Sequence, residues 1–182
     1  MTGSKTFVAL LRGINVGGRS LIAMADLRAL LSSLGLEDVV TYIQSGNVVF
    51  RSTVDDETAV AAKIEREIAG AFDVSPSVLL RTPGELETIV ASNPYLTRKA
   101  ELSKLHVVFL ERAPATSAAA ALDPERSPPD EFTLRGREIF LHLPNGAGRS
   151  KLTLDYFERA LEVRGTQRNW NTLLKLIALA RS

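Results

Sequence analysis

The sequence lacks cysteine entirely and lacks long apolar runs. Without cysteine among the 182 residues, disulfides, a thiolate nucleophile and cysteine-ligated zinc are all excluded. The strictly apolar stretches are only a few residues long, as in 7–11. A membrane-spanning helix needs about 20 apolar residues, so the sequence predicts no membrane association.

The beginning of the sequence also lacks the pattern of a signal peptide. The apolar segment 7–11 before Arg12 is shorter than the apolar region of about 7–15 residues that such a peptide needs. The expected compartment is therefore the cytoplasm. A net charge of +1, from 22 basic and 21 acidic residues, lacks the basic excess of a dedicated duplex-DNA binder. A local basic site stays compatible with this balance.

The first half of the chain shows the order β-α-β-β-α-β. Leu27, Leu30, Leu31 and Leu34 recur at the spacing of an amphipathic helix, and Ser45-Gly46-Asn47 has the residue types of a tight turn. The expected strands are 5–12, 38–44, 48–52 and 77–82, and the expected helices are 24–34 and 55–72. This is the ferredoxin-like split β-α-β order, with helices on one face of an antiparallel sheet.

The second half predicts a degenerate repeat of the same unit, in the order β-α-β-β-α-α. After a short helix at 84–92, the expected elements are a strand at 104–111, a helix at 115–122, a hairpin of 131–135 and 137–143, and helices at 153–162 and 171–181. Pro94 breaks the chain between the halves. We therefore expect an α+β fold with a ferredoxin-like subdomain at 1–93 and a second α+β subdomain at 94–182.

Five segments are similar to one known family. They are LRGINVGG at 11–18, MADLRALLSSLG at 24–35, TYIQSGNVVF at 41–50, GRSKL at 148–152 and TQRNWNTLLKL at 166–176. Together they resemble the bacterial domain of unknown function 1697 family. The resemblance implies a compact α+β fold with ferredoxin-like character and supplies no activity.

A glycine-rich loop, GINVGGRS at 13–20, is the first candidate site. It follows a strand and precedes a helix, as a phosphate loop does, but Arg19 stands where that loop has lysine. One interpretation is a nest of backbone N–H groups that binds an anion beside Arg19. The other is a tight loop whose glycines relieve backbone strain. The ligand-binding candidates of this half are Arg12, Gly13, Asn15, Gly17, Gly18, Arg19 and Asn47.

A second basic loop, 144–151, repeats this composition ahead of a helix whose N-terminus would attract anions. Arg149 and Lys151 are its candidate ligand-binding residues, although Gly-Arg-Ser is equally typical of a solvated turn. We hypothesise that Arg19 shares one concave surface with Arg149 and Lys151, or with Arg168. Antiparallel strands place the two loops at opposite ends of their units, so this hypothesis depends on how the halves pack.

The segment 166–172 supplies the last candidates, Arg168, Asn169 and Trp170. Asn169 is a good helix cap. Trp170, the only tryptophan, is either a buried anchor of the last helix or a stacking platform for a base or sugar beside Arg168.

The two histidines, His106 and His142, are the remaining candidates for metal binding or catalysis. If the second half follows the ferredoxin-like order, Leu105, Val107 and Phe109 face the helices. His106 and His142 then share the opposite face of the sheet. No third ligand accompanies them, and no catalytic motif is present, so the sequence predicts neither a metal nor a cofactor and leaves open whether the protein is an enzyme.

Three functions stay open. The favoured one is binding of, or chemistry on, a phosphate-bearing or other anionic small molecule at the Gly/Arg-rich loops. A single-stranded nucleic-acid module is disfavoured, because the central strands offer few aromatics and strand 5–12 should be buried on both faces. A regulatory or oligomerising protein without catalysis is the third, and the oligomeric state is not specified by the sequence.

Overall fold

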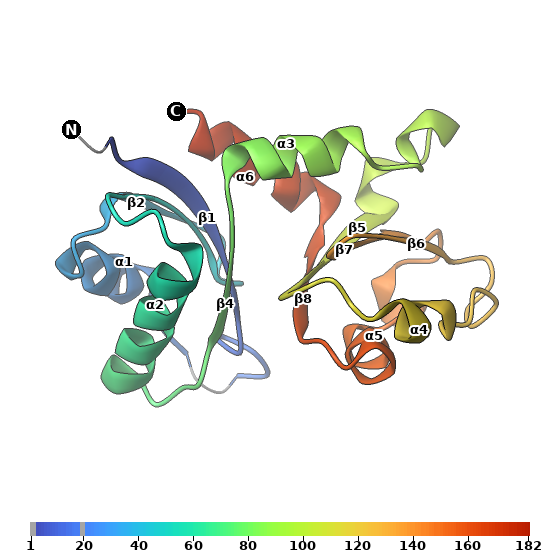
Figure 1. Ribbon diagram of the computed structural model, residues 1–182, viewed down its shortest axis with the longest axis horizontal. Helices are drawn as coiled ribbons and strands as arrows, with labels where there is room; N and C mark the ends of the chain where they lie inside the picture. Colours follow the sequence, from blue (N-terminus) through green and yellow to red (C-terminus); the bar gives the residue numbers. More distant parts are fainter. Residues whose placement is uncertain (1–2, 19–20) are drawn as a thin grey trace. The chain divides into compact units, whose positions relative to one another are not determined.

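A computed structural model describes residues 3–18 and 21–182, which form two units (Figure 1). Contacts assign Met1–Glu87 and Lys175–Ser182 to the first unit and Thr88–Leu174 to the second. The last residues of the chain join the first unit because helix α6 (Trp170–Ala180) runs across the division.

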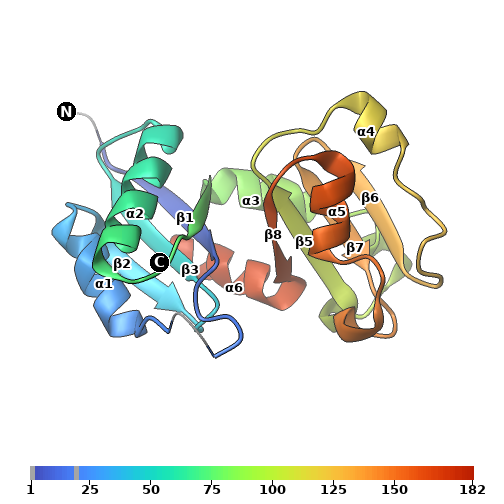
Figure 2. The same cartoon turned by 90° about the horizontal axis from the view of Figure 1, so that it is seen from below.

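The first unit has the expected β-α-β-β-α-β order. Its elements are β1 (Lys5–Arg12), α1 (Met24–Ser33), β2 (Glu37–Tyr42), β3 (Asn47–Ser52), α2 (Glu57–Ala71) and β4 (Ser77–Arg81), followed by α3 (Pro83–Ala91). The strands form one antiparallel sheet in the order β2-β3-β1-β4. Both α1 and α2 lie on the same side of this sheet (Figure 2), as the ferredoxin-like order requires.

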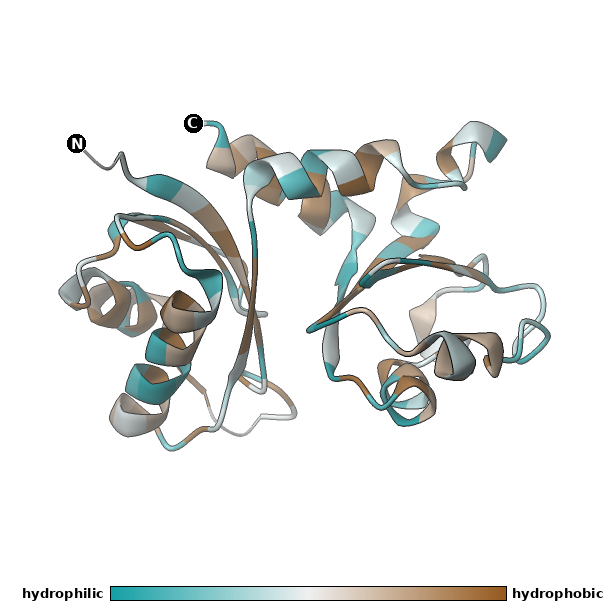
Figure 3. Ribbon diagram, in the orientation of Figure 1, coloured by the Kyte–Doolittle hydropathy of each residue, from teal (hydrophilic) through white to brown (hydrophobic). Residues whose placement is uncertain are grey.

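Strand β1 is the central, buried strand of the first unit. It pairs with β3 on one side and with β4 on the other. Phe7, Ala9 and Leu11 belong to the core that α1 and α2 cover, and Val8 and Leu10 on the other face are buried as well. The expectation that both faces of this strand are buried is therefore confirmed. Figure 3 shows the resulting hydrophobic colouring of the central strands.

The two helices of the first unit dock through their periodic apolar residues. In α1 the buried side chains are Leu27 and Leu31, one turn apart. Helix α2 begins where Asp56 caps it, because the Asp56 carboxylate accepts hydrogen bonds from the N–H groups of Thr58 and Ala59 at 2.9 and 3.1 Å. Such a cap fixes where the helix starts and therefore which face it turns to the sheet.

The second unit repeats this architecture. Two short 3-10 turns, η1 (Leu96–Arg98) and η2 (Leu102–Lys104), lead to β5 (Leu105–Leu110), α4 (Thr116–Ala120), β6 (Glu131–Arg135), β7 (Glu138–His142), η3 (Ala147–Arg149), α5 (Leu154–Leu161) and β8 (Gly165–Asn169). The antiparallel sheet has the order β6-β7-β5-β8. The α+β class with a repeated ferredoxin-like unit is confirmed, and the repeat is complete rather than degenerate.

Strand β8 is the element that the sequence analysis missed. The expected order ended in two helices, yet Gly165–Asn169 pairs with β5 along its length. The segment reads Gly-Thr-Gln-Arg-Asn, which has little strand propensity. Pairing with a central strand supplies its backbone hydrogen bonds, so tertiary context makes it a strand.

Among the described residues, no helix combines the length and apolarity needed to cross a bilayer.

Candidate functional site

The glycine-rich loop after β1 has an unusual backbone. Gly13, Asn15, Gly17 and Gly18 all have positive φ angles, of 84°, 52°, 63° and 70°. Side chains with a Cβ rarely adopt this left-handed region, whereas glycine does so at little cost. A Cβ at Gly13 would also approach the Ser75 carbonyl oxygen to 3.3 Å. The loop is therefore shaped by its glycines, as both interpretations of the sequence require.

The Asn15 side chain holds this loop in place. Its Oδ1 accepts a hydrogen bond from the N–H of Ile22 at 2.6 Å, and its Nδ2 donates to the Ile22 carbonyl at 3.1 Å. The same Nδ2 lies 2.9 Å from the carbonyl oxygen of Gln44, in the turn between β2 and β3. One amide thus closes the loop and joins it to a turn distant in sequence. We call the loop 13–18 and the turn 43–46 together the loop–turn surface.

The turn itself confirms a prediction. Gly46 has a φ of +80°, which is the left-handed geometry expected for Ser45-Gly46-Asn47. Asn47 is fully buried and donates from Nδ2 to the Tyr42 carbonyl and to Ser45 Oγ, at 3.1 and 2.8 Å. Leu11 donates its N–H to the Gly46 carbonyl oxygen at 2.7 Å. The buried Asn47 side chain therefore stabilises the turn through these two hydrogen bonds.

Replacing Gly46 by alanine is expected to lower the free energy of unfolding by about 1–3 kcal/mol, because the added atom overpacks the turn. A Cβ there would lie 2.8 Å from Leu11 Cβ and 3.0 Å from the Leu11 carbonyl oxygen, on a backbone with positive φ. Urea unfolding followed by circular dichroism measures the loss. Gly70→Ala, in helix α2 with no atom near its added Cβ, is the matched control and should not destabilise the protein. Equal stability of Gly46→Ala and the parent protein would contradict the turn geometry.

The helix after the loop begins without a side-chain cap. Ala23 occupies the position before α1 and cannot accept a hydrogen bond from the first turn through its side chain.

Two apolar residues of the loop–turn surface are strongly exposed, Val16 at 68% and Ile43 at 51%, and Ile43 also has a φ of +50°. A β-branched residue in that conformation is strained. Strain and apolar exposure commonly accompany functional surfaces.

Of the two arginine candidates in this half, Arg12 and Arg19, the structure describes only Arg12. Arg12 ends β1 and is half-buried. Arg19, with Ser20, lies outside the described residues, so its predicted convergence with Arg149 and Lys151 or with Arg168 stays a prediction.

The second basic loop is held by its backbone. Lys151 donates its N–H to Ser127 Oγ at 3.0 Å, and its carbonyl oxygen accepts from Arg126 Nε at 3.0 Å. The side chains of Arg149 and Lys151 are exposed. Thr153 already caps α5, because its hydroxyl accepts the N–H of Tyr156 at 3.2 Å. This loop therefore has exposed cations, but a side-chain cap already occupies one N–H group at the N-terminus of α5.

The last predicted group is mostly buried. The Arg168 guanidinium donates to Thr166 Oγ1 at 2.6 Å and to the Gln167 carbonyl at 2.9 Å, and burial lowers its pKa to about 10. Asn169 Oδ1 accepts the N–H of Asn171, which makes Asn169 the expected cap of α6. Trp170 is 1% exposed, which fits the buried anchor rather than a stacking platform.

The expectation for the two histidines is wrong. Val108 and Leu110, rather than Val107 and Phe109, belong to the core beside α4 and α5. His106 is the cross-strand partner of Leu141, a residue of that core, so the two share the helix-covered face. His142 is the cross-strand partner of Leu105, on the other face. The histidines thus occupy opposite faces. Both faces of β5 are apolar, so the sequence alternation could not decide which one meets the helices.

Sequence reasoning also missed a pocket in the second unit. It lies beside the outer edge of the β6-β7-β5-β8 sheet, and Tyr95, Arg98 and Glu131 are among its polar residues. These residues fall in a loop and at the start of a strand, without any spacing that marks a motif. The only sequence signal was the density of prolines at 124–129.

Comparisons with known proteins give a family and a fold. The family described as "Protein of unknown function (DUF1697)" matches residues 4–140, so the similar segments at 148–152 and 166–176 lie beyond the match. A solved structure of a conserved bacterial protein from Streptococcus pneumoniae is 25% identical, with a TM-score of 0.73. The similarity covers 98% of this chain and 99% of that one. No curated protein matches.

Proposed function

Because the chain belongs to the DUF1697 family of proteins of unknown function, we propose from its geometry that the loop–turn surface binds a phosphate-bearing or other anionic small molecule. The observation that carries the proposal is the set of four left-handed residues, Gly13, Asn15, Gly17 and Gly18, in the loop ahead of α1, a helix without a side-chain cap. Successive backbone N–H groups in such a loop form anion-binding concavities. The positive end of the helix dipole adds to the attraction.

The charges near this surface are mixed but favour an anion. Arg12 precedes the loop and Arg19 follows it in the sequence. Asp26 in the first turn of α1 opposes them. Arginine suits phosphate and carboxylate groups because its planar fork donates two parallel hydrogen bonds. The cytoplasmic location that the sequence predicts is part of the same proposal.

Binding of single-stranded nucleic acid is a weaker proposal. Modules that bind RNA on an open sheet stack bases on exposed aromatics of the central strands. In the first unit the aromatics of the central strands, Phe7 and Phe50, are both fully buried, with ring centroids 5.8 Å apart. Both belong to the core that α1 and α2 cover, so the face of β1 and β3 away from these helices carries no aromatic side chain on which a base could stack.

A thermal-shift titration with pyrophosphate, nucleotides, sugar phosphates and a short oligonucleotide tests the proposal. A ligand at 100 times its dissociation constant adds about 2.7 kcal/mol of stability, which raises the melting temperature by about 5–10 °C for a chain of this size. Arg19→Ala is expected to abolish that shift, because it removes the charge beside the loop, while barely changing the melting temperature without ligand.

Arg66→Ala is the matched control in the same unit. Arg66 is exposed on α2, where its guanidinium pairs with the neighbouring Glu67 at 3.1 Å. Its loss should leave the ligand shift intact. A ligand shift that survives Arg19→Ala unchanged would place the anion elsewhere, and no shift with any of the anions would remove the proposal altogether.

A further inference from the structure

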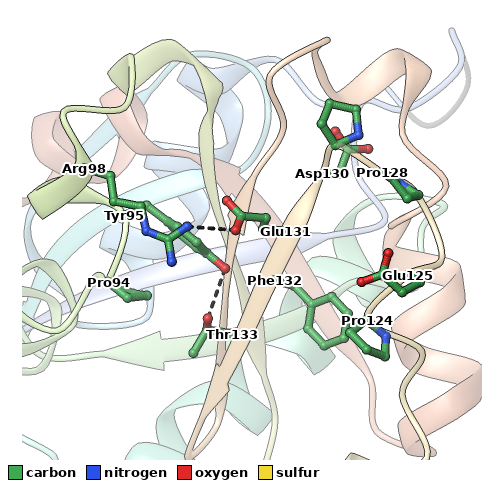
Figure 4. A pocket seen from close by; sticks show the side chains of 11 residues that line it. Pro94, Tyr95, Arg98, Pro124, Glu125, Pro128, Asp130, Glu131, Phe132 and Thr133 are labelled. Carbon is green, nitrogen blue, oxygen red and sulfur yellow. Dashed lines mark hydrogen bonds and ion pairs between the residues drawn. The ribbon is translucent and has the colours of Figure 1, made fainter.

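A pocket of about 410 Å³ lies within the second unit (Figure 4). Glu131, Phe132 and Thr133, consecutive residues of β6, all line it. Because neighbouring side chains of a strand point to opposite faces, a pocket that meets all of them runs along the edge of the strand. β6 is an edge strand, and β7 is its neighbour in the sheet. The volume is that of a site for a small organic molecule.

The polar wall on one side of β6 is pre-arranged. Glu131 Oε1 accepts a hydrogen bond from Arg98 Nη1 at 2.8 Å, and Glu131 Oε2 lies 3.3 Å from His142 Nδ1. Burial raises the pKa of Glu131, but the hydrogen bonds from Arg98 and His142 outweigh it and hold the pKa below its usual value. Tyr95 and Thr133 share a hydrogen bond of 3.0 Å between their hydroxyls. Both acidic oxygens of Glu131 are thus oriented, and its charge is maintained.

The lining carries an excess of negative charge. Its charged residues are one cation, Arg98, and three carboxylates, Glu125, Asp130 and Glu131. Figure 4 shows Glu131 beside Arg98 on one side of the strand and Glu125 beside Pro124 on the other. A molecule in the pocket would therefore meet carboxylates on both sides.

Asp130 adds a second, independent observation. It is 7% exposed, and its Oδ2 accepts a hydrogen bond from Ser127 Oγ at 2.7 Å. Its other oxygen, Oδ1, is buried without a hydrogen-bond partner among the described residues. A buried carboxylate oxygen without a donor is costly. This wall of the pocket is therefore short of positive charge or of hydrogen-bond donors.

The rest of the lining is apolar and rigid. Pro94, Pro124, Pro128 and Pro129 line the pocket together with Phe132. Proline rings have little conformational freedom to lose when a ligand packs on them. Pre-formed apolar walls of this kind suit a ring or a short hydrocarbon chain.

We propose that this pocket binds a small organic cation, with an ammonium or guanidinium group between the carboxylates and a ring or hydrocarbon portion against the prolines. The carboxylates on both sides and the donor-deficient Asp130 favour the cationic group of such a molecule. The apolar walls favour its ring or hydrocarbon portion. An anion would be repelled here, so this site is distinct in chemistry from the loop–turn surface of the first unit. The proposal does not depend on what that surface binds.

Isothermal titration calorimetry with benzylamine and agmatine tests the proposal, and benzyl alcohol serves as the uncharged comparison. Glu131→Gln and Glu125→Gln each keep the side-chain shape while removing one negative charge on either side of β6. Each is expected to weaken amine binding about tenfold, since each deletes one close charge–charge attraction. Glu125 is exposed, so its replacement keeps the test valid even if Glu131→Gln disturbs folding.

Asp155→Asn is the matched control. Asp155 is an exposed carboxylate of the second unit on α5, outside the pocket, and pairs with Arg159 at 3.1 Å. This variant should bind both amines as the parent protein does. The proposal is overturned if neither amine binds, if benzyl alcohol binds as tightly as benzylamine, or if the Glu125 and Glu131 variants both keep full affinity. Arg19→Ala should leave amine binding unchanged, which separates this site from the anion site.

Discussion

Replacing Leu10 by alanine is expected to lower the free energy of unfolding by about 2–5 kcal/mol. Leu10 is 1% exposed in the central strand β1, with Asn47 and Leu79 as its cross-strand neighbours. It points to the face opposite Phe7, Ala9 and Leu11, so the strand has no solvent side toward which the truncated residue could relax. The loss combines the transfer free energy of the removed atoms with the cost of the cavity.

Urea unfolding followed by far-ultraviolet circular dichroism measures this change, with Leu21→Ala as the control. Leu21 has the same side chain and lies in the same unit, but it is 71% exposed. Its truncation should change the stability by less than about 0.5 kcal/mol. If Leu10→Ala proves as mild as Leu21→Ala, the outer face of β1 is not a packed core.

Replacing Trp170 by alanine is expected to cost about 3–5 kcal/mol, the range for deleting a large buried aromatic. Trp170 is the first residue of α6 and is 1% exposed. Because it directly follows β8, its burial holds the start of the helix at the end of the strand. Urea unfolding by circular dichroism again gives the value, because the variant has no tryptophan to report fluorescence.

Trp170→Phe is the control that separates packing from recognition. Phenylalanine retains much of the buried apolar surface, so this variant should lose less stability than Trp170→Ala. The sequence also allowed Trp170 to be a stacking platform for a base or sugar. In that case Trp170→Ala would abolish ligand binding while leaving stability nearly unchanged, a result that would refute the anchor role.

Much of the first unit could be predicted because local and tertiary signals agree there. The helical spacing of Leu27 and Leu31 identified α1 and its buried side. The turn residues Ser45 and Gly46 correctly placed the hairpin between β2 and β3. Where pattern, turn chemistry and burial point the same way, a single sequence is sufficient.

The second unit shows where such reasoning fails. β8 has no strand-forming composition and exists because β5 offers it hydrogen bonds. β5 itself is apolar on both faces, so period-2 alternation could not orient His106. Both failures have one physical cause: the deciding interactions come from residues distant in sequence.

The candidate site was predictable only in part. Asn15 and the turn before Asn47 were singled out separately, and the structure joins them through the hydrogen bond from Asn15 to Gln44. The acidic pocket was not foreseen, because Glu131 and Asp130 become a wall only once Tyr95 and Arg98 are folded beside them. Such convergence is a property of loops and edges, which leave no periodic trace in the sequence.

The assignment of Lys175–Ser182 to the first unit has a consequence for biosynthesis. Arg181 pairs with Glu87 at 2.7 Å, and the end of α6 lines one cavity with Thr6 and Arg51 of the first sheet. A growing chain emerges from the ribosome with its N-terminal part first. The first unit is therefore synthesised early but acquires its last contacts late. Until residues 175–182 have been synthesised, its sheet lacks part of its covering, and that interval is when a chaperone or a protease would meet it.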